Sequence, residues 1–232
     1  MEAYFFDLDG TLTDARPGLY MSFRAALAPL GLSDVDDRGL SRFLGTPLPE
    51  MFRTLAPGVT HSEIERGMAA FRVAYEREGI HQNRLYDGIL DILREITSRG
   101  RKNWVVTSKP QPYADRVVLA LGLKGYVSGI VGAGLDENDT KAGLIRRALE
   151  LSGVDHGQVV MIGDRCYDIE GALANRVRPI GVLWGYGSKA ELRRSGCTDF
   201  ARTPAELADK LLKIRPSPLQ AQPGARRYAA VR

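Results

Sequence analysis

The stretch Tyr4-Phe5-Phe6-Asp7-Leu8-Asp9-Gly10-Thr11 decides the fold of this chain and places its chemistry. Three apolar residues in a row are typical of a buried strand in a parallel sheet. Two carboxylates follow, one residue apart, and Gly10 lets the backbone approach a ligand closely. Because ligands of open α/β sheets bind beyond the carboxyl ends of the strands, we expect Asp7 and Asp9 to lie in a binding site. A strand followed by an ordinary Asx or glycine turn is the alternative.

Composition limits the classes of protein to consider. The chain has 232 residues, of which 44% are hydrophobic and 26% charged, as expected of one large or two smaller globular domains. No apolar run approaches the roughly 18 residues of a membrane helix, and no signal peptide is visible. Two unpatterned cysteines, Cys166 and Cys197, fit a reducing compartment, so we expect a cytoplasmic protein. We expect it to be either a monomer or a homodimer. The net charge of +4 is scattered without interleaved aromatics, which argues against nucleic-acid or membrane partners.

The order of the predicted elements gives the architecture. Helical patterns fill residues 17–30, 38–44, 47–55 and 61–78, and no convincing strand appears between Asp14 and Tyr86. From Asp87 on, strands (103–107, 129–133, 158–162, 179–183) alternate with helices (89–96, 113–121, 141–151, 169–175, 189–195, 204–214). Such alternation predicts right-handed βαβ crossovers and a parallel sheet that is covered on both faces.

The predicted fold class is therefore α/β, with a Rossmann-like parallel core. The core comprises residues 1–14 and 87–214, and a small all-helical cap, residues 15–86, is inserted after the first strand. The tail, residues 215–232, holds three prolines and few large apolar residues, and we expect it to be disordered.

Polar residues follow several predicted strands in a pattern that suits one reaction. The strand at 103–107 ends in Thr107-Ser108-Lys109, and Lys141 opens a helix. Another strand ends in Gly163-Asp164, with Asp168 four residues further on. Two nearby anions repel each other unless a cation or a proton intervenes, and the hard cation Mg²⁺ suits an all-oxygen site. Each signal alone is weak, but together, in this order and at strand ends, they are specific.

These motifs resemble those of the haloacid dehalogenase superfamily, in the branch of phosphatases similar to phosphoglycolate phosphatase. The resemblance covers roughly residues 3–213. The segment from Asp7 to Asp14 matches the first motif of the family, Thr107 the second, Lys141 the third, and Gly163 to Asp168 the fourth. The helical insert lies where the family carries its small cap.

The resemblance implies a role for each residue, and general chemistry supports these roles. Asp7 would attack phosphorus and form an aspartyl-phosphate, and Asp9 would act as general acid and then as general base. Mg²⁺ would be held by the Asp7 carboxylate, the Asp9 backbone carbonyl and Asp164, with support from Asp168. Lys141 would offset the developing negative charge. The remaining phosphate contacts would come from Gly10, the Thr107 hydroxyl and the Ser108 backbone N–H.

Other activities in the same superfamily differ in a few residues. A dehalogenase uses a lone aspartate without metal, which the additional acids argue against. A phosphonate hydrolase needs a cap lysine, whereas the block from Asp14 to Tyr86 has nine arginines and no lysine. A phosphomutase keeps the same four motifs and stays open as an alternative. A signalling receiver domain, the non-enzymatic alternative, carries its acid pair before the phosphorylated aspartate and has no cap.

The cap would choose the substrate, which we expect to be a small phosphomonoester. Gly45 lies in a loop that resembles the substrate-facing segment of relatives, and Arg16, Arg42 and Arg53 are candidates to bind an anionic leaving group. An anionic leaving group favours a phosphoglycolate-like substrate, with a nucleoside monophosphate, and hence a 5'-nucleotidase, as the alternative. Lys109 would either touch the substrate or lie in solvent.

Overall fold

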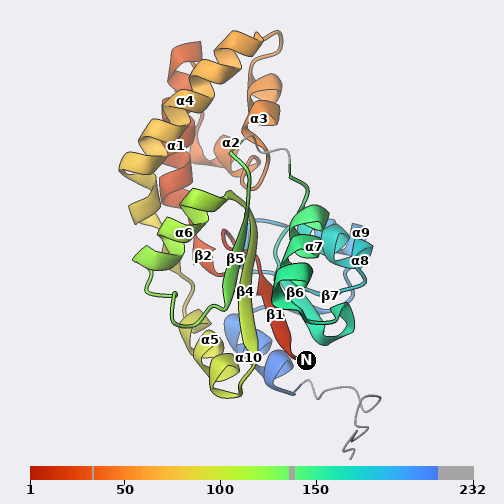
Figure 1. Cartoon of the computed structure of the whole chain (residues 1–232). Coiled ribbons are helices and arrows are strands. Elements are labelled where there is room, and N and C mark those ends of the chain that lie inside the picture. Colours follow the sequence, from red (N-terminus) through yellow and green to blue (C-terminus); the bar gives the residue numbers. More distant parts are fainter. Residues whose placement is uncertain (33, 136–138, 214–232) are drawn as a thin grey trace, which may run out of the picture.

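A six-stranded parallel sheet forms the centre of the protein (Figure 1). The structure is a computed structural model that describes residues 1–32, 34–135 and 139–213. The strands lie in the order β5 (Gly129–Ala133), β4 (Lys102–Pro110), β1 (Ala3–Phe6), β6 (Val159–Gly163), β7 (Arg178–Val182) and β8 (Phe200–Ala201). The expected α/β fold is confirmed, and β1, the strand that precedes Asp7, lies between β4 and β6 in the sheet.

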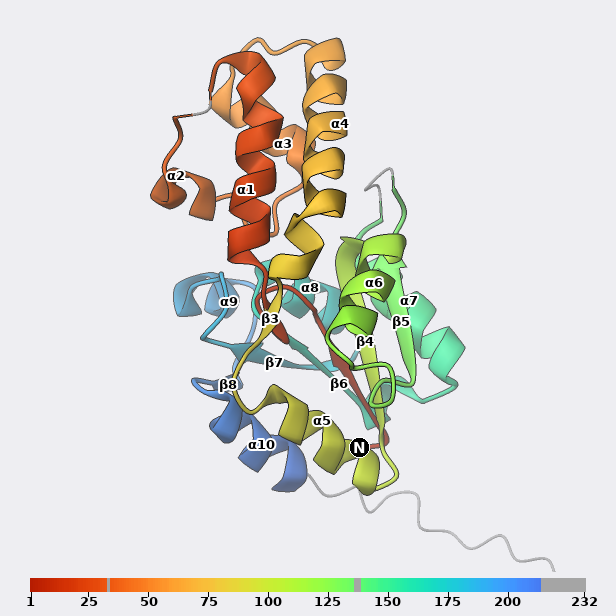
Figure 2. The same cartoon turned by 90° about the vertical axis from the view of Figure 1, so that its left-hand side faces the viewer.

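Helices cover both faces of the sheet, which explains the unbroken apolar sequence of β1. Alternate side chains point to opposite faces, so Tyr4 and Phe6 join one cluster of buried residues and Ala3 and Phe5 join another. One face carries α5 (Ile89–Ser98), α6 (Gln111–Ala120) and α10 (Pro204–Lys213), and the other carries α7 (Lys141–Ser152) and α8 (Cys166–Ala174). Helix α9 (Lys189–Arg194) packs beside α8. Figure 2 shows α5 and α10 together below the cap.

The segment predicted as the cap is a group of helices beyond the carboxyl ends of the core strands (Figures 1 and 2). It contains α1 (Arg16–Leu27), η1 (Ala28–Leu30), α2 (Asp37–Ser41), α3 (Leu48–Leu55), α4 (His61–Arg77) and η2 (Gly79–Gln82). Close packing of α1 on η2 depends on Gly18, because a Cβ there would lie 2.3 Å from the carbonyl oxygen of Gly79. These helices lie over the end of the sheet at which the acids follow their strands.

Several predicted boundaries are wrong. Thr13–Asp14 (β2) pairs antiparallel with Arg84–Leu85 (β3), although no strand was expected between Asp14 and Tyr86. Strand β8 was also missed, because two-residue strands carry no readable periodicity. Strand β4 continues past Thr107 to Pro110, with a register shift between Val106 and Pro110. The predicted disordered tail, 215–232, and residue 214 lie outside the described residues.

The β2–β3 pair joins the chain where it enters and leaves the helical group. The predicted cap limits, residues 15–86, begin directly after β2 and end directly after β3. No helix among the described residues is long and apolar enough to cross a membrane.

Candidate active site

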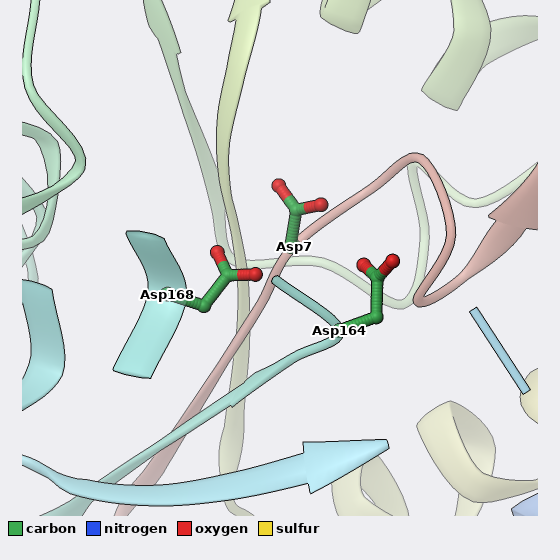
Figure 3. Close-up of side chains that lie close together, drawn as sticks. All are labelled: Asp7, Asp164 and Asp168. Carbon is green, nitrogen blue, oxygen red and sulfur yellow. The ribbon is translucent and has the colours of Figure 1, made fainter. Parts of the chain in front are cut away.

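Three buried aspartates lie together at the carboxyl ends of the central strands (Figure 3). Asp7 directly follows β1, Asp164 directly follows β6, and Asp168 lies in the first turn of α8. One carboxylate oxygen from each lies within 4.8 Å of the others. Because β1 and β6 are neighbouring parallel strands, their ends meet at one edge of the sheet and bring the residues around 7 and 164 side by side.

Lys141 is the cation that faces two of these acids. It is the first residue of α7, and its Nζ atom lies 2.6 Å from Asp7 Oδ1 and 2.8 Å from Asp168 Oδ1. The same Nζ donates a hydrogen bond of 3.1 Å to the carbonyl oxygen of Val106. Burial alone would lower the pKa of Lys141, but the carboxylates of Asp168 and Asp7 raise it well above its usual value. Lys141 therefore stays charged.

The acids carry more negative charge than Lys141 can balance. Asp164 accepts hydrogen bonds from Thr11 Oγ1 (3.0 Å) and the Tyr186 backbone N–H (2.7 Å), but it forms no ion pair with any described residue. Burial, together with the charges of Asp7 and Asp168, raises the pKa of Asp164 to about 8. Burial likewise raises the pKa of Asp168 to about 6, although Lys141 opposes this shift. A buried cluster of carboxylate oxygens that is short of positive charge fits a hard divalent cation such as Mg²⁺.

Magnesium binding should therefore compete with protons at this cluster. Because Asp164 must lose its proton to bind a cation, we expect the apparent affinity for Mg²⁺ to fall as the pH decreases from 8 to 6. Titration calorimetry at pH 7 in two buffers of different ionisation enthalpy should detect released protons. Mg²⁺ binding that releases no protons, with an affinity that stays constant between pH 8 and 6, would contradict the role of Asp164 as a metal ligand.

Gly10 makes room for Asp164. Its φ is +89°, and a Cβ at this position would lie 2.4 Å from Asp164 Oδ2. Gly10 is not among the residues that line the cavity described below, so the structure does not bring the predicted substrate contact to the cavity. Its observed contact is instead with Asp164.

We expect Gly10→Ala to weaken Mg²⁺ binding and to lower turnover by about tenfold or more, because Asp164 must move. Gly31→Ala is the matched control. Gly31 also has a positive φ, of +69°, but no described atom lies within 4 Å of the position that a Cβ would take. Both variants carry the strain of a left-handed residue, which costs roughly 1 kcal/mol or more. Calorimetry should separate them: equal Mg²⁺ affinity in both variants would contradict the role of Gly10.

Asp9 is paired with Lys109, which is buried rather than placed in solvent. Lys109 Nζ lies 2.7 Å from Asp9 Oδ2, and Thr13 Oγ1 lies 3.3 Å from Asp9 Oδ1. Burial raises the pKa of Asp9 above its usual value, and Asp7 adds to this shift, while Lys109 and Thr13 oppose it. Burial and the Lys109 ammonium thus act on the pKa of Asp9 in opposite directions.

A cavity of about 660 Å³ lies between the cap and the carboxyl ends of the strands. Its floor includes several predicted site residues: Asp7, Asp9, Thr107, Ser108, Lys141 and Asp168. Gly45, in the loop after α2, lines it from the cap. Aromatic and aliphatic cap residues form much of the remaining wall. A volume in this range suits a small-molecule ligand.

The arginines predicted to bind the leaving group lie elsewhere. Arg16 pairs with Asp14 at 2.6 Å, and neither Arg16, Arg42 nor Arg53 lines the cavity. Asp14 accepts a hydrogen bond of 3.1 Å from the backbone N–H of Arg16, the first residue of α1. All three arginines lie on cap helices or their ends, but helical position alone could not show which face each occupies.

Two further cavity residues, Arg165 and Tyr75, were not predicted from the sequence to lie in the site. Arg165 pairs with Glu191 at 2.8 Å and donates to the carbonyl oxygen of Leu44 in the cap. Tyr75 lies within the helical pattern predicted for residues 61–78, which gave it no role in a site. Its position near Lys109 depends on how the cap docks, for which the sequence carries no signal.

Comparison with known proteins identifies the family. The family model for haloacid dehalogenase-like hydrolases matches residues 4–182. The chain belongs to this family. By its relatives, this hydrolase is a phosphatase of the phosphoglycolate phosphatase-like branch. This family membership excludes the alternative of a signalling receiver domain.

Among its curated relatives, the hydrolase is 36% identical to a 5'-nucleotidase of Pseudomonas aeruginosa, over 89% of this chain and 93% of that protein. It is 32% identical to the tyrosine-protein kinase PtkA of Mycobacterium tuberculosis (89% and 71%) and 28% identical to a phosphoglycolate phosphatase of Neisseria meningitidis (85% and 87%). The crystal structure of a predicted phosphatase from Clostridium acetobutylicum superposes with a TM-score of 0.86 at 33% identity, covering 92% of this chain and 99% of that one.

Proposed function

We propose that this hydrolase is a Mg²⁺-dependent phosphatase that cleaves a small phosphomonoester through an aspartyl-phosphate on Asp7. The observation that carries the proposal is the placement of Asp7 on the cavity floor, 2.6 Å from Lys141 and among further buried acids. Asp7, Asp164 and the Asp9 backbone carbonyl would hold the metal, with Asp168 in support. When bound, Mg²⁺ supplies positive charge that offsets the charge of the phosphoryl oxygens.

In the first step, a carboxylate oxygen of Asp7 attacks phosphorus. A P–O bond to Asp7 forms while the P–O bond to the leaving group breaks, and Asp9 gives its proton to the departing oxygen. Lys141 lies against Asp7, where it offsets the charge that develops on the phosphoryl group. The Thr107 hydroxyl and the Ser108 backbone N–H, both at the cavity, would bind the remaining oxygens.

In the second step, water attacks the phosphorus of the aspartyl-phosphate. Asp9, now ionised, takes a proton from the water, and the bond between phosphorus and Asp7 breaks. Inorganic phosphate leaves, and Asp7 and Asp9 return to their initial states. The cap would limit bulk water at the reacting atoms, because it covers the carboxyl ends of the strands.

The cavity wall supports a nucleoside monophosphate more than a phosphoglycolate-like substrate. The phosphoglycolate prediction depended on cap arginines that do not line the cavity. Two other arginines do line it, but Arg72 donates to the carbonyl oxygen of Leu135 and Arg165 is paired with Glu191. A nucleoside offers apolar and aromatic surface to the wall residues Leu19, Phe23, Pro47, Leu48, Phe71 and Tyr113. The 36% identical relative named 5'-nucleotidase points the same way.

A panel of phosphate esters tests the proposal. Nucleoside monophosphates, phosphoglycolate and sugar monophosphates would each be incubated with the protein in Mg²⁺ or in EDTA, and inorganic phosphate would be measured. We expect multiple turnovers that require Mg²⁺, with kcat/KM highest for nucleoside monophosphates. Release of no phosphate from any ester would contradict the proposed phosphatase. Rearranged sugar phosphate without free phosphate would favour a phosphomutase instead.

A further inference from the structure

We propose that Lys109 and Tyr75 form a positioning link that orients the carboxyl group of Asp9 from the cap. The link would let Asp9 protonate the leaving group only when α4 is seated on the core. This inference rests on the proposed phosphatase, because it concerns the same general acid. Lys109 and Tyr75 would act through Asp9 and are positioning residues, not catalytic residues.

Lys109 contacts both the carboxyl group of Asp9 and the hydroxyl group of Tyr75. It lies near the end of β4, and its Nζ is 2.7 Å from Asp9 Oδ2. The same Nζ donates a hydrogen bond to the hydroxyl of Tyr75 and lies 4.5 Å from the centroid of the Tyr75 ring. Since Thr13 Oγ1 lies near the other oxygen of Asp9, the carboxyl group is held from both sides. A side chain so constrained has little freedom to rotate.

Tyr75 is in turn fixed by both the cap and the core. Only 1% of its surface is exposed. Its ring stacks on Phe71, one turn earlier in α4, at a centroid distance of 5.7 Å, and meets Tyr113 of α6 edge-on at 5.4 Å. Its hydroxyl also accepts a hydrogen bond of 3.4 Å from Asn83 Nδ2, close to β3. The position of Lys109 therefore depends on how α4 sits against the core.

Lys109 is not needed to balance the negative charge of Asp7. Lys141 already pairs with Asp7 and Asp168, whereas Lys109 pairs with Asp9 alone among the described acids. The competing view is that Lys109 binds the substrate, because it lines the cavity. The two roles predict different kinetics: a substrate contact changes KM, whereas a misplaced general acid lowers kcat for esters whose leaving group needs a proton.

The test compares two leaving groups in Tyr75→Phe, Lys109→Met and Lys109→Arg. A nucleoside monophosphate releases an alkoxide that must be protonated, whereas p-nitrophenyl phosphate releases a stable phenolate that needs no general acid. We expect kcat for the nucleotide to fall about tenfold in Tyr75→Phe and about 10²-fold in Lys109→Met, with KM little changed. The rate of the first-turnover burst of p-nitrophenolate, measured by rapid mixing, should stay near that of the wild type. Lys109→Arg should recover part of the lost kcat.

Glu76→Gln is the matched control. Glu76 accepts a hydrogen bond of 2.8 Å from the Tyr113 hydroxyl, so it joins α4 to the core without contacting Lys109 or Asp9. Its kinetics with both substrates should match those of the wild type. Tyr75→Phe removes only a hydroxyl, so it remains informative if Lys109→Met does not fold, as monitored by circular dichroism.

Three outcomes would overturn the link. A raised KM with unchanged kcat in Lys109→Met would make Lys109 a substrate contact. Equal losses for the two esters would indicate a general structural defect, and wild-type kinetics in Tyr75→Phe would remove Tyr75 from the mechanism. If the wild-type protein itself hydrolyses neither ester, the proposed function fails, which is a different result from a variant that behaves like the wild type.

Discussion

Asp7→Asn is expected to lower turnover by at least about 10⁴-fold, because an amide cannot serve as the nucleophile that accepts the phosphoryl group. Substrate binding should largely persist, since the cavity wall and the phosphate donors at Thr107 and Ser108 are unchanged. The loss should therefore appear in kcat and not in the dissociation constant of the substrate. Steady-state kinetics together with equilibrium binding of the nucleotide separates these quantities.

Asp14→Asn is the control for this substitution. Asp14 also lies near the start of the chain, but its carboxylate pairs with Arg16 and does not line the cavity. We expect kcat close to that of the wild type. Turnover in Asp7→Asn within about tenfold of the wild type would contradict a covalent role for Asp7. Samples must be checked for deamidation, because a small fraction of restored aspartate would mimic residual activity.

Lys141→Met is expected to reduce both activity and stability. Turnover should fall about 10²–10³-fold, since a positive charge is removed from beside the reacting carboxylate. Without metal, the free energy of unfolding should fall by about 3–5 kcal/mol, because buried Asp7 and Asp168 lose their shared cation. Burial raises the pKa of Asp168 to about 6, so its protonation relieves part of the excess charge and the loss of stability should shrink as the pH falls. Urea unfolding at two pH values, in EDTA, measures this effect.

Lys210→Met provides the comparison for Lys141→Met. Lys210 pairs with Asp199 at 2.8 Å, but both side chains are partly exposed to solvent. Such pairs contribute at most about 1 kcal/mol to stability, so the free energy of unfolding of this variant should be close to that of the wild type at either pH. If Lys141→Met matched Lys210→Met in stability and in activity, Lys141 would not neutralise the acid cluster.

Much of the fold could be predicted from periodicity and strand ends. The apolar run before Asp7 and the alternation after Asp87 were sufficient for a parallel α/β sheet, because packing of helices on both faces imposes that pattern. Strands β2, β3 and β8 were missed because each spans only two residues. The extension of β4 beyond Thr107 was also missed, since its polar end is determined by pairing with β5 at a register shift.

The candidate site, too, could be predicted only in part from the sequence. Acids at or shortly after strand ends were predicted to lie together, because neighbouring parallel strands end at one edge of the sheet. The structure brings one carboxylate oxygen each of Asp7, Asp164 and Asp168 within 4.8 Å of the others. Residues on cap helices could not be placed, because their position depends on how the cap docks on the core. For this reason Arg16 and Arg53 were assigned to the substrate, while Tyr75 and its contact with Lys109 were missed.

Direct capture of a phosphorylated enzyme is the measurement that tests the central claim most sharply. Asp9→Asn should retain the nucleophile but lose the general base, so the intermediate should accumulate when this variant reacts with p-nitrophenyl phosphate. The mixture would be quenched in acid, digested and examined by peptide mass spectrometry. Our proposal predicts one phosphoryl group on the peptide that contains Asp7, and none when Asp7 is also replaced by asparagine. Burst release of p-nitrophenolate without phosphate on Asp7, or with phosphate on another residue, would contradict the proposal.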